Sequence, residues 1–283
     1  IGNEGQEPMG IVIHKDAAEK IKTIAGRERS PMDVVGETTG DMKCVFEQAD
    51  GKRPLDLELA DFFGSAPKTI MQDTTLHEEY LNPDYDVNNI DEYLTNVLQL
   101  EAVACKDWLT NKVDRSVTGK IARQQCQGEI QLPLSDLGAI ALDYKGKSGI
   151  ATSIGHAPQV AMIDPGAGAV ISIAEALTNI VFAPFTDGLK GISLSANWMW
   201  PCKNPGEDAR LYRAVEACSD FACELGINIP TGKDSLSMTQ KYGDDKVYSP
   251  GTVIISAAGE VSDIRKIVSP TLAYIKGTYL YYV

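Results

Sequence analysis

Apolar residues recur at helical spacing in two stretches of the second half of the chain. In residues 207–225 the apolar positions follow one another in alternating steps of four and three: Leu211, Val215, Cys218, Ala222 and Leu225. Acidic residues at the start of this stretch suit a helix dipole, and Gly226 can end the helix as a C-cap. A second apolar stripe predicts a helix at 167–182.

Shorter patterns predict further elements around these two helices. A helix is expected at 90–101, because apolar residues again follow helical spacing there. Strands are expected at 106–113, 137–143, 159–163, 191–195 and 252–260. The mixture of strands and helices, with hairpin-like connections early in the chain, favours an α+β fold over a doubly wound sheet.

The first part of the chain has weaker hydrophobic patterns, and we interpret it as part of a separate domain. An apolar run at 10–13 followed by a helical pattern to residue 27 predicts a strand and then a helix, and short strands or extended segments are expected at 33–37, 42–47 and 55–59. Residues 65–89 are rich in Pro, Asp, Asn and Tyr and show no sustained periodicity. We interpret them as a linker.

Composition and charge narrow the class of protein. The chain has 283 residues, of which 43% are hydrophobic and 23% charged, so it has the material for one large or two ordinary globular domains. The formal net charge of -13 argues against non-specific nucleic-acid binding. Since there is no membrane-spanning or signal-peptide pattern, a cytoplasmic protein is expected. The first residue is Ile rather than Met and a polar stretch follows, which suggests an excised fragment.

Cysteine and histidine spacing excludes several kinds of site. The six cysteines form no C-x2-C pair, so we expect reduced, mostly structural thiols. The three histidines are far apart in sequence and have no partner at metal or triad spacing, which favours ordinary surface or core histidines. We therefore assign no catalytic residue.

Three oxygen-bearing residues are candidates for a metal site. Glu175 and Asn179 are four residues apart on a predicted helix, so their side chains are neighbours and can share a hard cation such as Mg²⁺. A solvated polar face explains the same spacing. Asp136 comes at the entrance to a predicted strand, where an aspartate can equally serve a local turn.

Two further segments could meet phosphate oxygens. Residues 114–119 form a hydroxyl- and glycine-containing segment after a predicted strand, without the spacing of a Walker loop. Residues 231–235 are expected to form a turn that carries one lysine, and they too could be an ordinary solvated loop.

Six motifs occur together in one order along the chain. They are Asp-Arg-Ser-Val-Thr-Gly at 114–119, Gln-x-Pro-x-x-Asp at 131–136, Glu-Ala-Leu-Thr-Asn at 175–179, Leu-Ser-Ala-Asn-Trp-Met at 194–199, Pro-Gly-Glu-Asp at 205–208 and Gly-Lys-Asp-Ser-Leu-Ser-Met at 232–238. This series closely resembles the large, single-chain form of phosphoribosylformylglycinamidine synthase, and the resemblance covers essentially the whole chain.

The resemblance implies a domain organisation for an internal fragment of such an enzyme. Residues 1–70 would be the tail of the first half's C-terminal domain, and 71–89 the linker. Residues 90–265 would be the second half's N-terminal domain, of the aminoimidazole ribonucleotide synthetase type, with a mixed sheet packed with helices. Residues 266–283 would begin the following C-terminal domain. The remaining domains, including a glutaminase domain, would be its partners.

The resemblance also implies a function and a ligand set. The family is an ATP-dependent carbon–nitrogen ligase of purine biosynthesis that takes ammonia from glutamine. By analogy Asp136, Glu175 and Asn179 would bind the Mg²⁺ of an auxiliary ATP or ADP site, with Ser135 and Lys106 as nucleotide contacts. The fragment itself is expected to be inactive alone.

Two alternatives stay open at this point. One is another member of the same superfamily, such as an aminoimidazole ribonucleotide synthetase or a selenophosphate synthetase. The other is a non-catalytic scaffold that pairs through its sheet and that self-associates when its partner half is missing. Nucleotide binding would separate a scaffold from a remnant of an active site.

Overall fold

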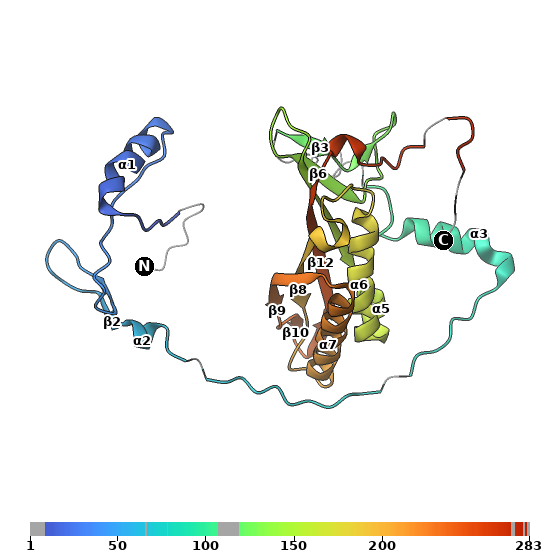
Figure 1. The fold of residues 1–283 in the computed structure, drawn as a ribbon. Coiled ribbons are helices and arrows are strands. Elements are labelled where there is room, and N and C mark those ends of the chain that lie inside the picture. Colours follow the sequence, from blue (N-terminus) through green and yellow to red (C-terminus); the bar gives the residue numbers. More distant parts are fainter. Residues whose placement is uncertain are drawn as a thin grey trace. The chain divides into compact units, whose positions relative to one another are not determined.

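The computed structural model describes residues 9–65, 67–77, 79–106, 119–272, 275–279 and 281 (Figure 1). The chain divides into two compact units, Ile1–Thr69 and Ile70–Val283. Most of the predicted strand at 106–113 and most of the motif at 114–119 lie outside the described residues. The domain organisation implied by the resemblance stays a prediction.

The first unit contains short elements and no buried residue among those described. Its elements are η1 (Lys15–Ala17), α1 (Ala18–Arg27), β1 (Lys43–Phe46), β2 (Leu55–Glu58) and α2 (Leu59–Phe62). β1 and β2 pair antiparallel, with Cys44 opposite Leu57. This is the only ladder within residues 9–65, so the strand predicted at 10–13 was wrong.

The second unit is built on a six-stranded mixed sheet. In spatial order its strands are β3 (Ile121–Arg123), β6 (Leu137–Ala141), β7 (Gly149–His156), β12 (Thr252–Val261), β8 (Ile192–Met199) and β9 (Asn228–Ser235). The β8–β9 pair is parallel and the other four pairs are antiparallel. A mixed sheet packed with helices confirms the predicted α+β fold.

Helices and small hairpins surround this sheet. The helical elements are η2 (Val87–Asn89), α3 (Ile90–Gln99), α5 (Pro158–Ile163), α6 (Pro165–Ile180), η3 (Gly188–Gly191), α7 (Glu207–Leu225) and η4 (Ile264–Lys266). Two hairpins pair β4 (Cys126–Gln127) with β5 (Leu132–Pro133), and β10 (Thr239–Tyr242) with β11 (Asp245–Tyr248). Within the described residues, no helix is long and apolar enough to cross a membrane.

The core of the second unit lies between the sheet and α6. This helix packs against β7 and β12, and α7 packs beside it, as Figure 1 shows. Fully buried side chains from the helix and the sheet meet there, including Ile173 on α6, Leu194 on β8 and Ile255 on β12. Residues on β7 alternate between buried and exposed, so one face of the strand points into this core.

Most of the longer elements agree with the sequence predictions. The helices expected at 90–101, 167–182 and 207–225 are confirmed as α3, α6 and α7, and the strands at 137–143, 191–195 and 252–260 as β6, β8 and β12. Gly206 and Gly226 flank α7 with positive φ values of 81° and 67°.

Two predictions in this unit were wrong. The strand expected at 159–163 is the short helix α5, which Pro158 begins as its first residue, a position where the fixed φ of proline favours a helix. The turn expected at 231–235 lies inside β9, whose Gly232 allows a close approach to β8. A Cβ at Gly232 would come within 2.2 Å of the Ala196 carbonyl oxygen.

Candidate nucleotide and metal site at the β6–β7 edge

The helix α6 carries two of the predicted metal ligands. Its start is fixed by Asp164, whose carboxylate accepts hydrogen bonds from the backbone N–H groups of Gly166 (2.8 Å) and Ala167 (3.0 Å). From there the helix runs against the sheet, and Glu175 and Asn179 lie half-buried on its flank one turn apart.

Both side chains are held by the backbone of β7. The Glu175 Oε2 accepts a hydrogen bond from the His156 N–H at 2.6 Å, and the Asn179 Nδ2 donates one to the Ile154 carbonyl at 3.0 Å. The β6–β7 ladder ends at the pair Leu137–Ser153, so these two backbone groups lie just beyond it. The side chains from α6 therefore bind backbone groups of β7 that β6 does not reach.

Asp136 lies at the same edge of the sheet. It directly precedes Leu137, the first residue of β6, which pairs with Ser153 of β7. If this antiparallel register is continued by one residue, Asp136 lies opposite Ile154. The Ile154 carbonyl is the group that accepts the hydrogen bond from Asn179. The Asp136 side chain is exposed, while Ser135 beside it is half-buried and donates its N–H to the Gln125 carbonyl at 3.1 Å. The topology thus gathers Asp136, Glu175 and Asn179 around the start of β6 and the end of β7.

The donor chemistry of these three residues fits a hard cation. Glu175 uses one carboxylate oxygen for the backbone, and Asn179 uses its amide nitrogen, so an oxygen of each remains for a ligand. Two carboxylates and one amide oxygen suit Mg²⁺, which keeps several waters and binds through a few protein oxygens. Among the described residues there is no cluster of three or more His, Cys, Asp or Glu able to hold a metal.

His156 is a site neighbour that sequence reasoning missed. Its Nδ1 lies 3.7 Å from Glu175 Oε2, in addition to the bond made by its backbone. In sequence it is one of three widely separated histidines, and β7 was not predicted. In the sequence, the alternation of small residues with the larger Thr152, Ile154 and His156 is the signal that could have revealed this strand.

The other predicted ligand contacts have local partners. Lys106 follows α3, and its Nζ donates to the backbone carbonyls of Glu101 and of Ala104, the latter at 3.0 Å. On β9 the Lys233 Nζ donates to Ser235 Oγ at 2.8 Å. The role of Lys106 as a nucleotide contact stays a prediction.

Comparison with known proteins decides the family. A family model described as "FGAR-AT PurM_N-like domain" matches residues 105–260, which is more than half of the chain. The chain belongs to the FGAR-AT PurM_N-like domain family. The match spans α6, α7 and all strands of the six-stranded sheet except the last residue of β12.

Curated relatives of this family member bear the name suggested by the motifs. The chain is similar to human phosphoribosylformylglycinamidine synthase, with 38% identity over 303 residues, covering 100% of this chain and 22% of the relative. The same enzyme of Drosophila melanogaster is 39% identical and is matched over 96% of this chain and 21% of its own length. These relatives confirm the resemblance, and the chain spans about a fifth of their length.

Solved structures with the same fold support the architecture. PurLQS from Thermotoga maritima aligns with a TM-score of 0.60 at 16% identity, covering 91% of this chain and 38% of that chain. T. maritima PurL complexed with ATP aligns with a TM-score of 0.57 at 16% identity and the same coverage. PurL of that organism complexed with FGAR aligns with a TM-score of 0.55 at 17% identity, over 90% of this chain and 36% of that one.

Proposed function

We propose that this chain carries part of a magnesium–nucleotide site of a phosphoribosylformylglycinamidine synthase. The whole enzyme would convert formylglycinamide ribonucleotide, ATP and glutamine to formylglycinamidine ribonucleotide, ADP, phosphate and glutamate. The family match and the curated relatives support this activity, and a PurL of the same fold is complexed with ATP. The chain alone would bind nucleotide without turning it over.

The anchoring of Glu175 and Asn179 to β7 carries the proposal. Hydrogen bonds to His156 and Ile154 hold the two side chains in place before any ligand binds, next to the start of β6 where Asp136 lies. Such pre-positioning lowers the cost of assembling a cation site, because the side chains are already ordered.

Each residue of the site would have a separate task. Asp136, Glu175 and Asn179 would hold Mg²⁺, and Ser135 and Lys106 would contact the nucleotide. Bound there, the cation would neutralise charge on the nucleotide phosphates, which this chain's net charge of -13 would otherwise repel. The His156 N–H would keep one Glu175 oxygen oriented while the other faces the ligand.

Calorimetric titration with ADP, with and without Mg²⁺, tests the site. We expect binding by the chain that depends on Mg²⁺ and that falls at least tenfold in Glu175→Gln. Glutamine retains an oxygen to accept the His156 N–H and removes only the charge. Glu224→Gln, on an exposed position of α7, is the matched control and should bind like the parent chain.

A second readout identifies where the cation binds. Mn²⁺ in place of Mg²⁺ should broaden the amide resonances of His156 and Glu175 in NMR spectra, and Glu175→Gln should abolish that broadening. The proposal is wrong for this chain if millimolar ADP binds equally well with and without Mg²⁺, or if broadening appears only elsewhere.

A pairing scaffold is the second candidate function. The exposed residues of β7 include Ile154, whose side chain is 58% exposed on the face away from α6. A scaffold would self-associate without binding ADP, so light scattering combined with the titration separates the two functions. The enzyme's remaining domains would be its partners in either case, and a cytoplasmic location is expected from the biosynthetic role.

A further inference from the structure

The long helix α7 begins at a residue that cannot cap it. The first N–H groups of a helix have no partner within the helix, and a side chain at the N-cap position usually accepts from one of them. In α7 this position is Gly206, which has no side chain and a φ of 81°. The Glu207 N–H donates to the Asn204 carbonyl at 3.1 Å, which leaves the N–H groups of Asp208 and Ala209 for an acceptor outside the helix.

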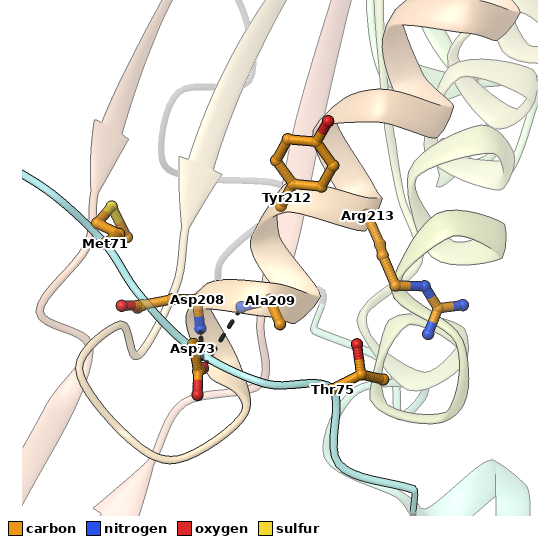
Figure 2. Close-up of a pocket in the computed structure, with 7 residues that line it drawn as sticks. All are labelled: Met71, Asp73, Thr75, Asp208, Ala209, Tyr212 and Arg213. Atoms are coloured by element: carbon orange, nitrogen blue, oxygen red, sulfur yellow. Dashed lines mark hydrogen bonds between the residues drawn. The ribbon is translucent and has the colours of Figure 1, made fainter.

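Asp73 is that acceptor, although it lies more than 130 residues earlier. Its Oδ1 accepts from the Gly206 N–H at 3.1 Å, and its Oδ2 accepts from the N–H groups of Asp208 (3.1 Å) and Ala209 (3.4 Å). Figure 2 shows the carboxylate directly at the first turn of the helix. Backbone donors, first that of Thr74 and then that of Gly206, lower the pKa of Asp73, and its negative charge suits the positive end of α7.

Two other contacts tie the same segment to helices of the second unit. Leu76 packs over Gly206 so closely that a Cβ at Gly206 would lie 2.9 Å from the Leu76 Cγ. The Tyr80 hydroxyl donates to the Met162 carbonyl at 2.7 Å, and that carbonyl also accepts from Arg210 Nη2 at 2.9 Å. The segment thus touches α7 and the end of α5 at separate points.

Around Asp73 the segment does not pack tightly on the helix. A cavity of about 260 Å³ lies there, lined by Met71, Asp73, Thr75, Asp208, Ala209, Tyr212 and Arg213 (Figure 2). The apolar side chains nearby remain half exposed, with Met71 at 45% and Leu76 at 51%. Little apolar surface is removed from water, so the polar anchor at Asp73 dominates the attachment.

We propose that residues 71–77 and Tyr80 form a strap that is docked on α7, and that Asp73 is its latch. The carboxylate takes the place of the missing N-cap, so docking of the strap and order in the first turn of α7 form one cooperative unit. The strap lies at the start of the second unit, two residues after Thr69, the last residue of the first unit.

Hydrogen exchange measured by mass spectrometry on the 283-residue chain tests the latch. In Asp73→Ala we expect exchange to quicken about fivefold, as for loss of an N-cap, both in the amides of Asp208 and Ala209 and in residues 71–77. Asp73→Asn keeps one acceptor oxygen and should give a smaller change in the same two places. Thr75 lines the same cavity, and no hydrogen bond joins it to α7 among the described residues. Thr75→Ala is therefore the matched control.

The proposal requires that exchange quickens both in residues 71–77 and in the first turn of α7 when the Asp73 carboxylate is removed. Faster exchange in α7 alone would mean that Asp73 caps the helix without retaining the strap, and would overturn the proposal. Faster exchange in the strap alone, or none in either region, would overturn it as well. Circular dichroism of both Asp73 variants verifies that the fold is retained, and none of these outcomes depends on nucleotide binding.

Discussion

Two cysteines on α7 lie five residues apart in very different surroundings. Cys218 is 2% exposed in the core, and burial raises the pKa of its thiol to about 11. Cys223 is exposed on the same helix. None of the six cysteines forms a disulfide in the part of the chain that the structure describes. Their reactivity should therefore follow burial rather than position in the sequence.

Alkylation at pH 8 should separate these two thiols. Because a thiol with a pKa of about 11 is almost entirely protonated at that pH, and is also shielded, Cys218 should react with iodoacetamide at least a hundredfold more slowly than Cys223. Mass spectrometry of tryptic peptides measures both rates in one sample. In guanidinium chloride the rates should converge, and comparable rates in the native chain would contradict the assigned burial.

The site residues show which features of single positions a sequence can reveal. The pair Glu175 and Asn179 was predictable, because a spacing of four on a helix makes two side chains neighbours. Their attachment to Ile154 and His156 was not predictable, since it depends on where β6 begins along β7. The strap anchor Asp73 was equally invisible, because its partners lie in a helix more than 130 residues away.

At the scale of elements, α6 and β7 are packed with almost no space between their backbones. A Cβ at Gly155 on β7 would lie 2.2 Å from the Ser172 carbonyl oxygen and 2.3 Å from the Ala176 nitrogen. Next to it, the Ser153 hydroxyl donates to the Ala176 carbonyl at 2.6 Å. The position of α6, and with it that of Glu175, therefore depends on a residue without a side chain.

Gly155→Ala should displace α6 and destabilise the second unit. Since the added methyl group would meet backbone atoms that cannot rotate away, we expect a loss of about 3 kcal/mol in the free energy of unfolding. Urea denaturation followed by circular dichroism measures it. Gly138→Ala on β6 is the matched control, because its Cβ would have its nearest contact at 3.7 Å. It should change stability by less than about 0.5 kcal/mol, and an equal effect of both variants would refute the close approach.

Two elements of the second unit were predicted wrongly, for different physical reasons. Helices α6 and α7 have long periodic stripes, so their existence and approximate ends were clear. The run at 159–163 is too short for its period to distinguish strand from helix, and Pro158 decides for a helix. β9 contains Gly232 and polar residues that are typical of a turn, and it forms a strand because β8 offers a parallel neighbour.

The two units of the molecule differ in how far their residues are buried. The second unit has a continuous buried core between its sheet and α6 and α7. The described part of the first unit, residues 9–65, has no buried residue, and large apolar side chains such as Val35 (97%) and Phe63 (75%) are exposed. A hairpin and a short helix without a core are marginally stable in water. The two units should therefore differ widely in their resistance to local unfolding.

Hydrogen exchange under native conditions should show this difference directly. Amides of β1, β2 and α1 should exchange within about a hundredfold of the rates of an unfolded peptide, since opening them breaks few apolar contacts. Amides in the middle of β7 and β12, paired on both sides, should exchange only with global unfolding of the second unit. Urea below the unfolding midpoint should leave the first set unchanged and accelerate the second. Strong protection of β1 and β2 would instead mean that residues 9–65 bury their apolar side chains in solution.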